Sequence, residues 1–308
     1  MKNRSKLATF HEIFWNIVSD MRIPISSIAK NMGHTGRGRR RSTISNYVNE
    51  MYQKEISFKP RIVMKTYKYP KRKMYFCKKA GVGIAPLWKK LKEDERIQYS
   101  LILSGPCDFI IISRDDTLDL EKDFGLQIVE ESLLYTPIYT LPKGWNISFK
   151  TAAKNALDIP FKKGLFTRKI DDILIWTDLT LRIFELMHED ARVSYTDVAD
   201  KTDVYSSTVR NHLEKYILPR CEIAHFFFPK GYKNYMKNFF RIYTHYEQSL
   251  VKAFEKLPCT TYVYPLEEGI AFNVFHEDIN MVMTMLEKMR ENGFLEDLSL
   301  FTPLRYWE

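Results

Sequence analysis

The sequence has few cysteines and no long apolar run. Its 308 residues include four cysteines, Cys77, Cys107, Cys221 and Cys259, with no CxxC pair among them. This spacing argues against a zinc ribbon or a redox dithiol and favours buried, reduced thiols. No run of 18 apolar residues occurs, so we expect no membrane span. The N-terminal segment MKNRSKLATFHEIFW lacks the apolar core and cleavage site of a secretory signal, which favours a cytoplasmic protein.

The sequence also lacks the spacings of common metal, nucleotide and catalytic motifs. No P-loop pattern GxxxxGK[ST] is present, and no HxH or HExxH spacing links the histidines. The histidines considered as metal ligands are His188, His212, His225, His245 and His276. We therefore predict no metal, no cofactor and no catalytic residue, and we expect the chain not to be an enzyme.

Positive charge is concentrated at one end of the chain. Residues 1–92 contain 22 Lys and Arg against 4 Asp and Glu, a net charge of +18. Residues 155–308 contain 19 against 23, a net charge of −4. A strongly cationic region attracts polyanions, and nucleic acid is the usual one. The charge distribution therefore predicts that the N-terminal region binds DNA.

Three short matches in the same order indicate an internal duplication. The matched pairs, at offsets of 170, 165 and 166, are 22–29 (RIPISSIA) with 192–199 (RVSYTDVA), 42–44 (STI) with 207–209 (STV), and 134–138 (LYTPI) with 300–304 (LFTPL). Three matches at nearly one offset predict tandem copies of one unit. We call residues 1–142 the N-terminal half and residues 168–308 the C-terminal half.

Each half is predicted to begin with three short helices. The apolar positions at helical spacing in the N-terminal half are Phe10, Ile13, Phe14, Ile17, Val18, Ile28, Ala29, Ile44, Val48 and Met51. Those in the C-terminal half are Leu181, Ile183, Phe184, Met187, Val198, Ala199, Val209, Leu213 and Ile217. Ser42 is expected to cap the third helix of the N-terminal half. Because this third helix has a polar outer face, the pattern is typical of a helix-turn-helix.

A strand pair is expected after each helical triplet, at 60–67 and at 222–228, as the wing of a winged helix-turn-helix. The remainder of each half reads as β-α-β-β-α-β, which is the ferredoxin-like order. The segments expected are 74–77, 84–92, 98–103, 109–113, 118–121 and 132–136, and then 239–243, 247–257, 260–264, 270–275, 279–292 and 298–302. Such a sheet carries helices on one face, so its other face is free to pack on a second sheet.

The predicted fold class is therefore α+β, a tandem repeat of a winged helix-turn-helix followed by a ferredoxin-like βαββαβ domain. The expected domains are 1–73 and 168–235 for the two winged helix-turn-helix copies, and 74–142 and 236–308 for the two ferredoxin-like copies. Residues 143–167 are expected to form a linker, because their periodicity is weak and they contain Gly144, Pro160 and Gly164.

This order of elements resembles the Lrp/AsnC family of bacterial and archaeal transcription regulators. Segment 191–216 (ARVSYTDVADKTDVYSSTVRNHLEKY) looks like the helix-turn-helix of that family, and segment 103–113 (LSGPCDFIIIS) looks like its glycine–aspartate hairpin. The resemblance implies a small-molecule effector, such as an amino acid, at Ser104, Gly105 and Asp108. The C-terminal half departs from the pattern, because Glu267-Glu268-Gly269-Ile270 replaces the hairpin motif. Typical members also carry one such unit per chain.

The loop before the third helix holds the densest positive charge. Residues 34–43 read HTGRGRRRST and make this turn five residues longer than its counterpart in the C-terminal half. We expect Arg37, Arg39, Arg40 and Arg41 to contact DNA, through phosphates or in a minor groove. A solvated basic linker is the alternative.

Further DNA contacts are expected from the third helix and from the wing of the N-terminal half. On the helix, the hydrogen-bonding candidates are Ser42, Thr43, Ser45, Asn46 and Asn49. Around the wing, the phosphate-binding candidates are Lys65, Lys68, Lys71, Arg72 and Lys73. A second face in the C-terminal half has Arg210, Asn211, His212 and Lys215. Because residues 155–308 have a net negative charge, contact with DNA and contact with protein are equally supported for this second face.

Three functions fit these observations. The leading hypothesis is a sequence-specific, duplex-DNA-binding transcription regulator in which one chain imitates a dimer or forms a homodimer. Siroheme decarboxylases resemble the same two-domain architecture and occur as pairs of similar subunits, so a tetrapyrrole decarboxylase is the alternative. An adaptor that binds nucleic acid with one half and protein with the other is the third.

Overall fold

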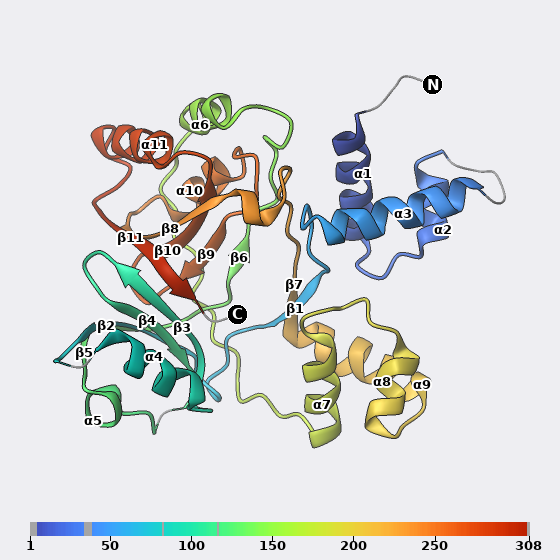
Figure 1. Ribbon diagram of the computed structural model, residues 1–308, viewed down its shortest axis with the longest axis horizontal. Coiled ribbons are helices and arrows are strands. Elements are labelled where there is room, and N and C mark those ends of the chain that lie inside the picture. The colour runs from blue at the N-terminus through green and yellow to red at the C-terminus, as the bar shows by residue number, and fades with distance from the viewer. Residues whose placement is uncertain (1–4, 34–38, 82, 116, 307–308) are drawn as a thin grey trace.

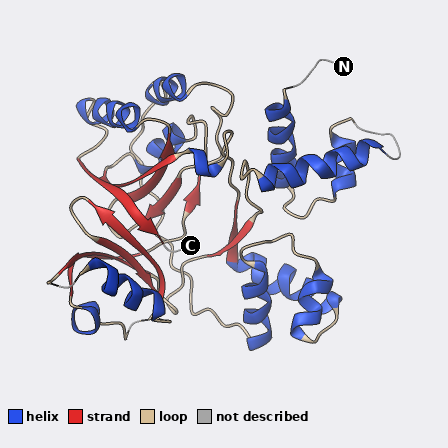
Figure 2. Ribbon diagram, in the orientation of Figure 1, coloured by secondary structure: helices blue, strands red, loops and turns tan. Residues whose placement is uncertain are grey.

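The structure is a computed structural model that describes residues 5–33, 39–81, 83–115 and 117–306 (Figure 1), with only the backbone described at residues 39–42 and 306. Two groups of short helices lie on one side of the molecule, and the long strands with their covering helices lie on the other (Figure 2). No helix among the described residues is both long enough and apolar enough to cross a bilayer.

The two helical triplets match the apolar patterns of the sequence. The N-terminal triplet is α1 (Lys6–Ser19), α2 (Ile25–Asn31) and α3 (Arg39–Gln53), and the C-terminal triplet is α7 (Asp178–Met187), α8 (Tyr195–Thr202) and α9 (Ser206–His212). Residues 213–217 continue α9 as one π-helical segment. Each triplet has its own apolar core, around Ile13 and Ile44 in one and around Ile183 and Val209 in the other. The expected core is confirmed except at Val18, which is half-buried, and at Leu181, which is exposed.

The third N-terminal helix begins earlier than expected. Helix α3 starts at Arg39, so Ser42 lies within the first turn and is not its N-cap. Arginine has a high helix propensity, which explains why the run of arginines joins the helix. Arg37 lies outside the described residues.

The two expected wings are replaced by one shared ribbon. Strand β1 (Arg61–Met64) pairs antiparallel with β7 (Cys221–Ala224), so each half contributes one strand. The prediction of a separate strand pair in each half was wrong. Pairing across the halves satisfies the backbone groups along the facing edge of each strand.

Two arginines also join the helical triplets. The Arg22 guanidinium donates to the carbonyl oxygens of Ala191 and Val193. The Arg192 guanidinium donates to those of Met21, at 2.6 Å, and Ile23, at 2.9 Å. The contact is reciprocal, as across a two-fold interface.

The remaining elements form two four-stranded units with helices. The first contains β2 (Lys73–Lys79), α4 (Ile84–Glu93), β3 (Ile97–Ser104), β4 (Phe109–Ser113), α5 (Leu120–Phe124) and β5 (Leu126–Leu133). The second contains β8 (Met236–Tyr243), α10 (Glu247–Phe254), β9 (Tyr262–Pro265), β10 (Ile270–His276), α11 (Ile279–Glu291) and β11 (Asp297–Tyr306). The strand orders are β5-β2-β4-β3 and β11-β8-β10-β9, the same arrangement in both.

The end of each unit crosses to the other. The C-terminal part of β11 pairs with β3, with Thr302 opposite Ser104. The short strand β6 (Ile138–Tyr139) pairs with β9, with Ile138 opposite Val263. These exchanges join all the long strands into one nine-stranded sheet.

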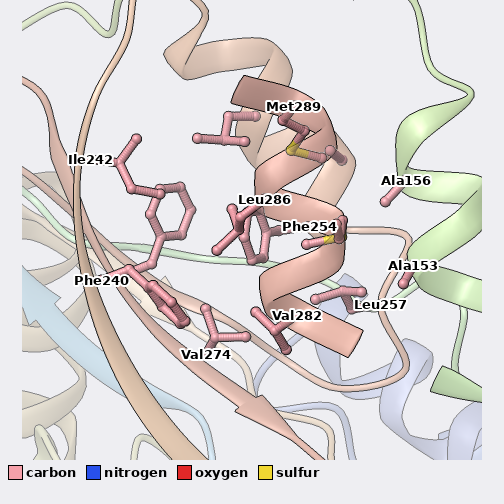
Figure 3. Close-up of a cluster of buried hydrophobic side chains, with 14 of the residues drawn as sticks. Ala153, Ala156, Phe240, Ile242, Phe254, Leu257, Val274, Val282, Leu286 and Met289 are labelled. Carbon is pink, nitrogen blue, oxygen red and sulfur yellow. The ribbon is translucent and has the colours of Figure 1, made fainter. Parts of the chain in front are cut away.

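Helices cover the outer faces of the strands, and the inner faces pack together. Figure 3 shows the outer core of the second unit, where Phe254 and Leu286 meet Phe240 and Ile242 of β8. The inner core includes Phe76 and Leu103 from the first unit and Phe239 and Phe301 from the second. The layers are therefore helices, the strands of the first unit, the strands of the second unit and helices, with α4 and α5 on one side and α10 and α11 on the other (Figure 1).

The expected linker contains a helix, α6 (Phe149–Leu157), which the sequence did not predict. Its N-cap is Ser148, whose hydroxyl accepts from the Thr151 backbone NH. The small side chains of Ala152, Ala153 and Ala156 pack on α10 and α11. Alanine has little hydrophobic surface, which made the helical periodicity weak in the sequence.

Candidate ligand cavity and nucleic-acid surface

A cavity of about 650 Å³ lies between the inner faces of the two units. Its lining combines aromatic, aliphatic and cationic side chains with one carboxylate and one amide: Glu55, Phe58, Arg61, Met74, Tyr99, Leu101, Ile110, Ile112, Tyr139, Phe226, Tyr232, Lys233, Tyr235, Lys237, Phe239, Tyr262, Tyr264 and Asn273. Small-molecule and cofactor sites have volumes of roughly 300–1,000 Å³ and mainly apolar walls with a few polar groups. The cavity volume falls within that range, and its walls are more polar than that description because Glu55, Arg61, Lys233 and Lys237 lie among the apolar side chains.

Three tyrosines of the cavity, Tyr139, Tyr262 and Tyr264, keep their protons. Burial raises the pKa of Tyr262 and Tyr264 well above the ordinary value, and it also raises that of Tyr139. A phenol with a raised pKa is neutral at physiological pH and can donate a hydrogen bond. The walls are therefore apolar rings that present hydroxyl groups.

Two polar atoms of the lining are buried without a hydrogen-bond partner among the described residues. They are the Tyr235 hydroxyl and the Asn273 Oδ1. Such atoms cost free energy in a folded protein, and they commonly indicate an absent ligand or water. Lys237 also lines the cavity, and its ammonium donates to the Tyr232 hydroxyl at 2.7 Å.

A second, adjoining cavity of about 300 Å³ shares Arg61, Tyr99, Ile112, Tyr139 and Tyr264 with the first. Arg72 lines this second cavity and is only 9% exposed, with its guanidinium donating to the Met64 carbonyl oxygen. We therefore withdraw Arg72 from the predicted phosphate contacts, because a buried guanidinium cannot reach DNA. The sequence placed it on a wing that does not form.

The other basic residues near this ribbon are partly paired. Lys65 lies 3.5 Å from Glu222, Lys68 lies 2.8 Å from Asp172, and Lys73 lies 2.7 Å from Glu131. Lys71 is exposed. Ion pairs at the surface contribute little to stability, and these lysines can exchange a carboxylate for a phosphate. Arg72 is therefore the one residue that we remove from the predicted phosphate contacts.

Helix α3 presents polar side chains to solvent. Thr43, Asn46 and Asn49 are exposed, and Ser45 is half-buried. Only the helical backbone is described for Arg39, Arg40, Arg41 and Ser42.

The corresponding face of the C-terminal triplet is less open. The Arg210 Nε pairs with Glu214 at 2.8 Å, and the His212 Nδ1 lies 2.9 Å from the Thr180 hydroxyl. Asn211 is half-buried, and Lys215 is exposed.

The glycine–aspartate hairpin serves packing between the units. Gly105 has φ +142°, and a Cβ there would lie 2.8 Å from the Leu300 carbonyl oxygen. The Asp108 carboxylate accepts from the Lys79 backbone NH at 2.9 Å. Ser104 is exposed and pairs with Thr302 through the sheet. These contacts explain the glycine and the aspartate without an effector.

The four cysteines are buried and reduced, as expected. Among the described residues, no group of three or more His, Cys, Asp and Glu side chains is placed to hold a metal ion. Burial lowers the pKa of His11, His225 and His276 to about 4, so these imidazoles are neutral.

The described fold defines a class of protein in which paired helical triplets are attached to a double-sheet domain that encloses a cavity. Residues 177–217 match the family described as winged helix-turn-helix DNA-binding, which spans α7 to the π-helical segment. The match supports a DNA-binding role for that segment. No curated protein matches the chain significantly.

Two solved structures are similar over almost the whole chain. The crystal structure of the siroheme decarboxylase NirDL has a TM-score of 0.50 and 11% identity, and the similarity covers 97% of this chain and 91% of that one. The structure of NirDL in co-complex with an iron-uroporphyrin III analogue has a TM-score of 0.52 and 9% identity, with 97% and 92% covered. At these identities the similarity shows a shared fold.

The expectation that the chain is not an enzyme is contradicted by these matches. An enzyme has this arrangement over nearly its whole length, so a winged helix-turn-helix in the sequence does not exclude catalysis. The sequence reasoning also missed the cavity residues, which come from segments more than 100 positions apart. The alternation Tyr262-Val263-Tyr264 was the available signal, since it directs both tyrosines to one face of a strand.

Proposed function

We propose that the protein binds a polycarboxylated tetrapyrrole in the cavity between its two units and acts on it as a siroheme-decarboxylase-type enzyme. The observation that carries the proposal is the cavity itself, with its tyrosine walls, its lysines and arginine, and its unpartnered Tyr235 and Asn273 atoms. Flat aromatic walls suit a macrocycle, and cationic groups suit its carboxylates. The fold shared with NirDL supports the same conclusion.

The residues of this chain would have two tasks in such a reaction. Decarboxylation breaks the bond between a carboxyl carbon and the adjacent carbon, which keeps the electron pair and then takes up a proton. Lys237 would hold a carboxylate that does not react, and Arg61 and Lys233 would do the same after exchanging their ion pairs with Glu189 and Glu55 for the ligand. The neutral hydroxyls of Tyr262 and Tyr264 would serve as proton donors to that carbon.

Titration with iron-uroporphyrin III tests the proposal. We expect a saturable shift of its visible absorption at one equivalent per chain, and carbon dioxide released when siroheme is the substrate. The variant Asn273→Tyr fills the cavity and should lose the shift, whereas Asn155→Tyr, on the exposed face of α6, should keep it. An equal shift in both variants would place the tetrapyrrole elsewhere.

We also propose that the two halves are tandem copies arranged as a pseudo-dimer. Arg22 and Arg192 occupy matching positions in the sequence repeat, and each donates to the main chain of the other half. The segments 136–138 and 302–304 also match in sequence, and each leads into a strand that pairs with the opposite unit. Reciprocal contacts between matched residues are what a duplicated, two-fold symmetric dimer would retain.

Sequence-specific DNA binding is the second candidate function. The match of residues 177–217 to winged helix-turn-helix proteins favours it, and so does the net charge of +18 in residues 1–92. In this proposal α3 reads the duplex through Thr43, Asn46 and Asn49, and the chain regulates transcription. Affinity for duplex DNA should fall steeply with salt, and a flat plot of log K against log salt would refute it.

A further inference from the structure

Two arginines, the buried Arg72 and the half-buried Arg114, face the second cavity without a carboxylate partner among the described residues. Arg72 and Arg114 both line this space of about 300 Å³. Arg72 is 9% exposed and donates one hydrogen bond, to the Met64 carbonyl oxygen at 3.0 Å. The Arg114 Nε is buried and has no hydrogen-bond partner among the described residues.

The acidic groups near the cavity do not neutralise this pair. Glu189 also lines the cavity, but its carboxylate lies 2.8 Å from Arg61 and is 60% exposed. Glu185 raises the pKa of Arg114, although burial has the larger effect and lowers it. Among the described residues, no carboxylate lies within 4.0 Å of the Arg72 or Arg114 guanidinium.

Two guanidinium groups placed this way repel each other. Burial lowers the pKa of Arg72 to about 10, and the charge of Arg114 contributes to the same shift. Burying a charge without a partner is costly, and arginine stays protonated under ordinary conditions. An anion with two planar oxygens would remove both costs, because guanidinium binds carboxylate through paired N–H donors.

We propose that Arg72 and Arg114 form a binding site for a carboxylate group. The site stands independently of the proposed tetrapyrrole function, since a small free acid satisfies it. Its walls include Phe184 and His188 of the C-terminal triplet, so a bound carboxylate would touch that triplet directly. The carboxylate could belong to a free acid or to a larger ligand that extends from the adjoining cavity through the shared residues Tyr99 and Tyr139.

Acetate and succinate, compared with chloride at equal ionic strength, test the site in the full-length protein. We expect both acids to raise the melting temperature and to change the fluorescence of Trp176, whose ring centroid lies 5.0 Å from that of Phe184. Arg114→Met should show a higher melting temperature in chloride, because an unpaired and partly buried charge is gone, and no response to acetate. Arg290→Met, at an exposed position on α11, should keep the wild-type response.

A further variant keeps the test decisive if Arg114→Met does not fold. Arg114→Lys retains the charge but loses the paired donors, and should bind acetate at least about tenfold more weakly. Equal melting temperatures in acetate and chloride for the wild type would overturn the site, and so would an acetate response retained in Arg114→Lys at full affinity. Repeating the titrations with iron-uroporphyrin III separates the two sources. A weakened tetrapyrrole affinity in Arg114→Lys assigns the carboxylate to that ligand, and an unchanged one assigns it to a free acid.

Discussion

The reciprocal arginine contact between the helical triplets leads to a quantitative prediction. Arg22 donates two hydrogen bonds to carbonyl oxygens of the C-terminal triplet, and its guanidinium lies 4.0 Å from the centre of the Tyr195 ring. Hydrogen bonds from a charged group contribute about 1.5–3 kcal/mol, and an exposed cation–π contact about 0.5–1 kcal/mol. Because Arg22 is only half-buried, we expect Arg22→Met to lower the free energy of unfolding by about 2–3 kcal/mol.

Arg192→Met should cost about 2 kcal/mol, since this arginine makes the matching pair of bonds. The double variant should cost less than the sum of the two, because losing either arginine already loosens the shared interface. Urea denaturation followed by tryptophan fluorescence measures all three values, with Arg290→Met as the surface control. If both single variants lowered the free energy of unfolding by less than about 0.5 kcal/mol, the range of ordinary surface substitutions, the contact would not hold the two triplets together.

Three further predictions concern the glycine–aspartate hairpin, acid stability and DNA. Gly105→Ala should lower the free energy of unfolding by about 1–3 kcal/mol, because Gly105 has φ +142° and the new Cβ would lie too close to the Leu300 carbonyl oxygen. In the same urea assay, the control Gly83→Ala should change this free energy little, because its Cβ would make only ordinary contacts. Burial lowers the pKa of His276 to about 4, below the value near 6.5 of the unfolded chain, so stability is full above pH 6.5 and is lost as the pH falls toward 4. Urea denaturation at pH values across this window should show that protonation of His276 lowers the free energy of unfolding by at most about 3 kcal/mol. In His276→Leu, the free energy of unfolding should fall less steeply as the pH falls. Replacing Arg37 and Arg39–Arg41 with alanine should reduce the salt slope of DNA affinity by about 0.9 for each phosphate that these arginines neutralise, and unchanged slope and affinity would make the loop a solvated linker.

The sequence predicted the helical cores because helical spacing is a local property. Ile13, Ile44, Ile183 and Val209 recur at positions that place them on one face, and each is buried where expected. The long strands 109–113 and 270–275 were likewise found close to their observed bounds.

Pairing between distant segments was not predictable from local patterns. The residues of β1 do not indicate that its partner is β7, about 160 positions away. The prediction of a local hairpin was therefore wrong. The same assumption put Arg72 on a surface wing, whereas the shared ribbon encloses it. Helix α6 was missed because three of its buried residues are alanines.

The candidate ligand site depends on these long-range pairings. Tyr99, Tyr139 and Tyr264 come from three separate strands and meet only because the two units face each other. In a single sequence, these tyrosines cannot be distinguished from the other aromatic residues of the core. The cavity was therefore visible only in the three-dimensional arrangement, and it changed the leading functional proposal from a regulator to a tetrapyrrole enzyme.

The most direct test of that proposal is the stoichiometry and location of tetrapyrrole binding. Iron-uroporphyrin III titrated into the wild-type chain should give a saturable absorption shift at one equivalent, and the shift should be absent from folded Asn273→Tyr and present in Asn155→Tyr. No shift in the wild type, or a shift of equal size in Asn273→Tyr, would contradict the proposed cavity site.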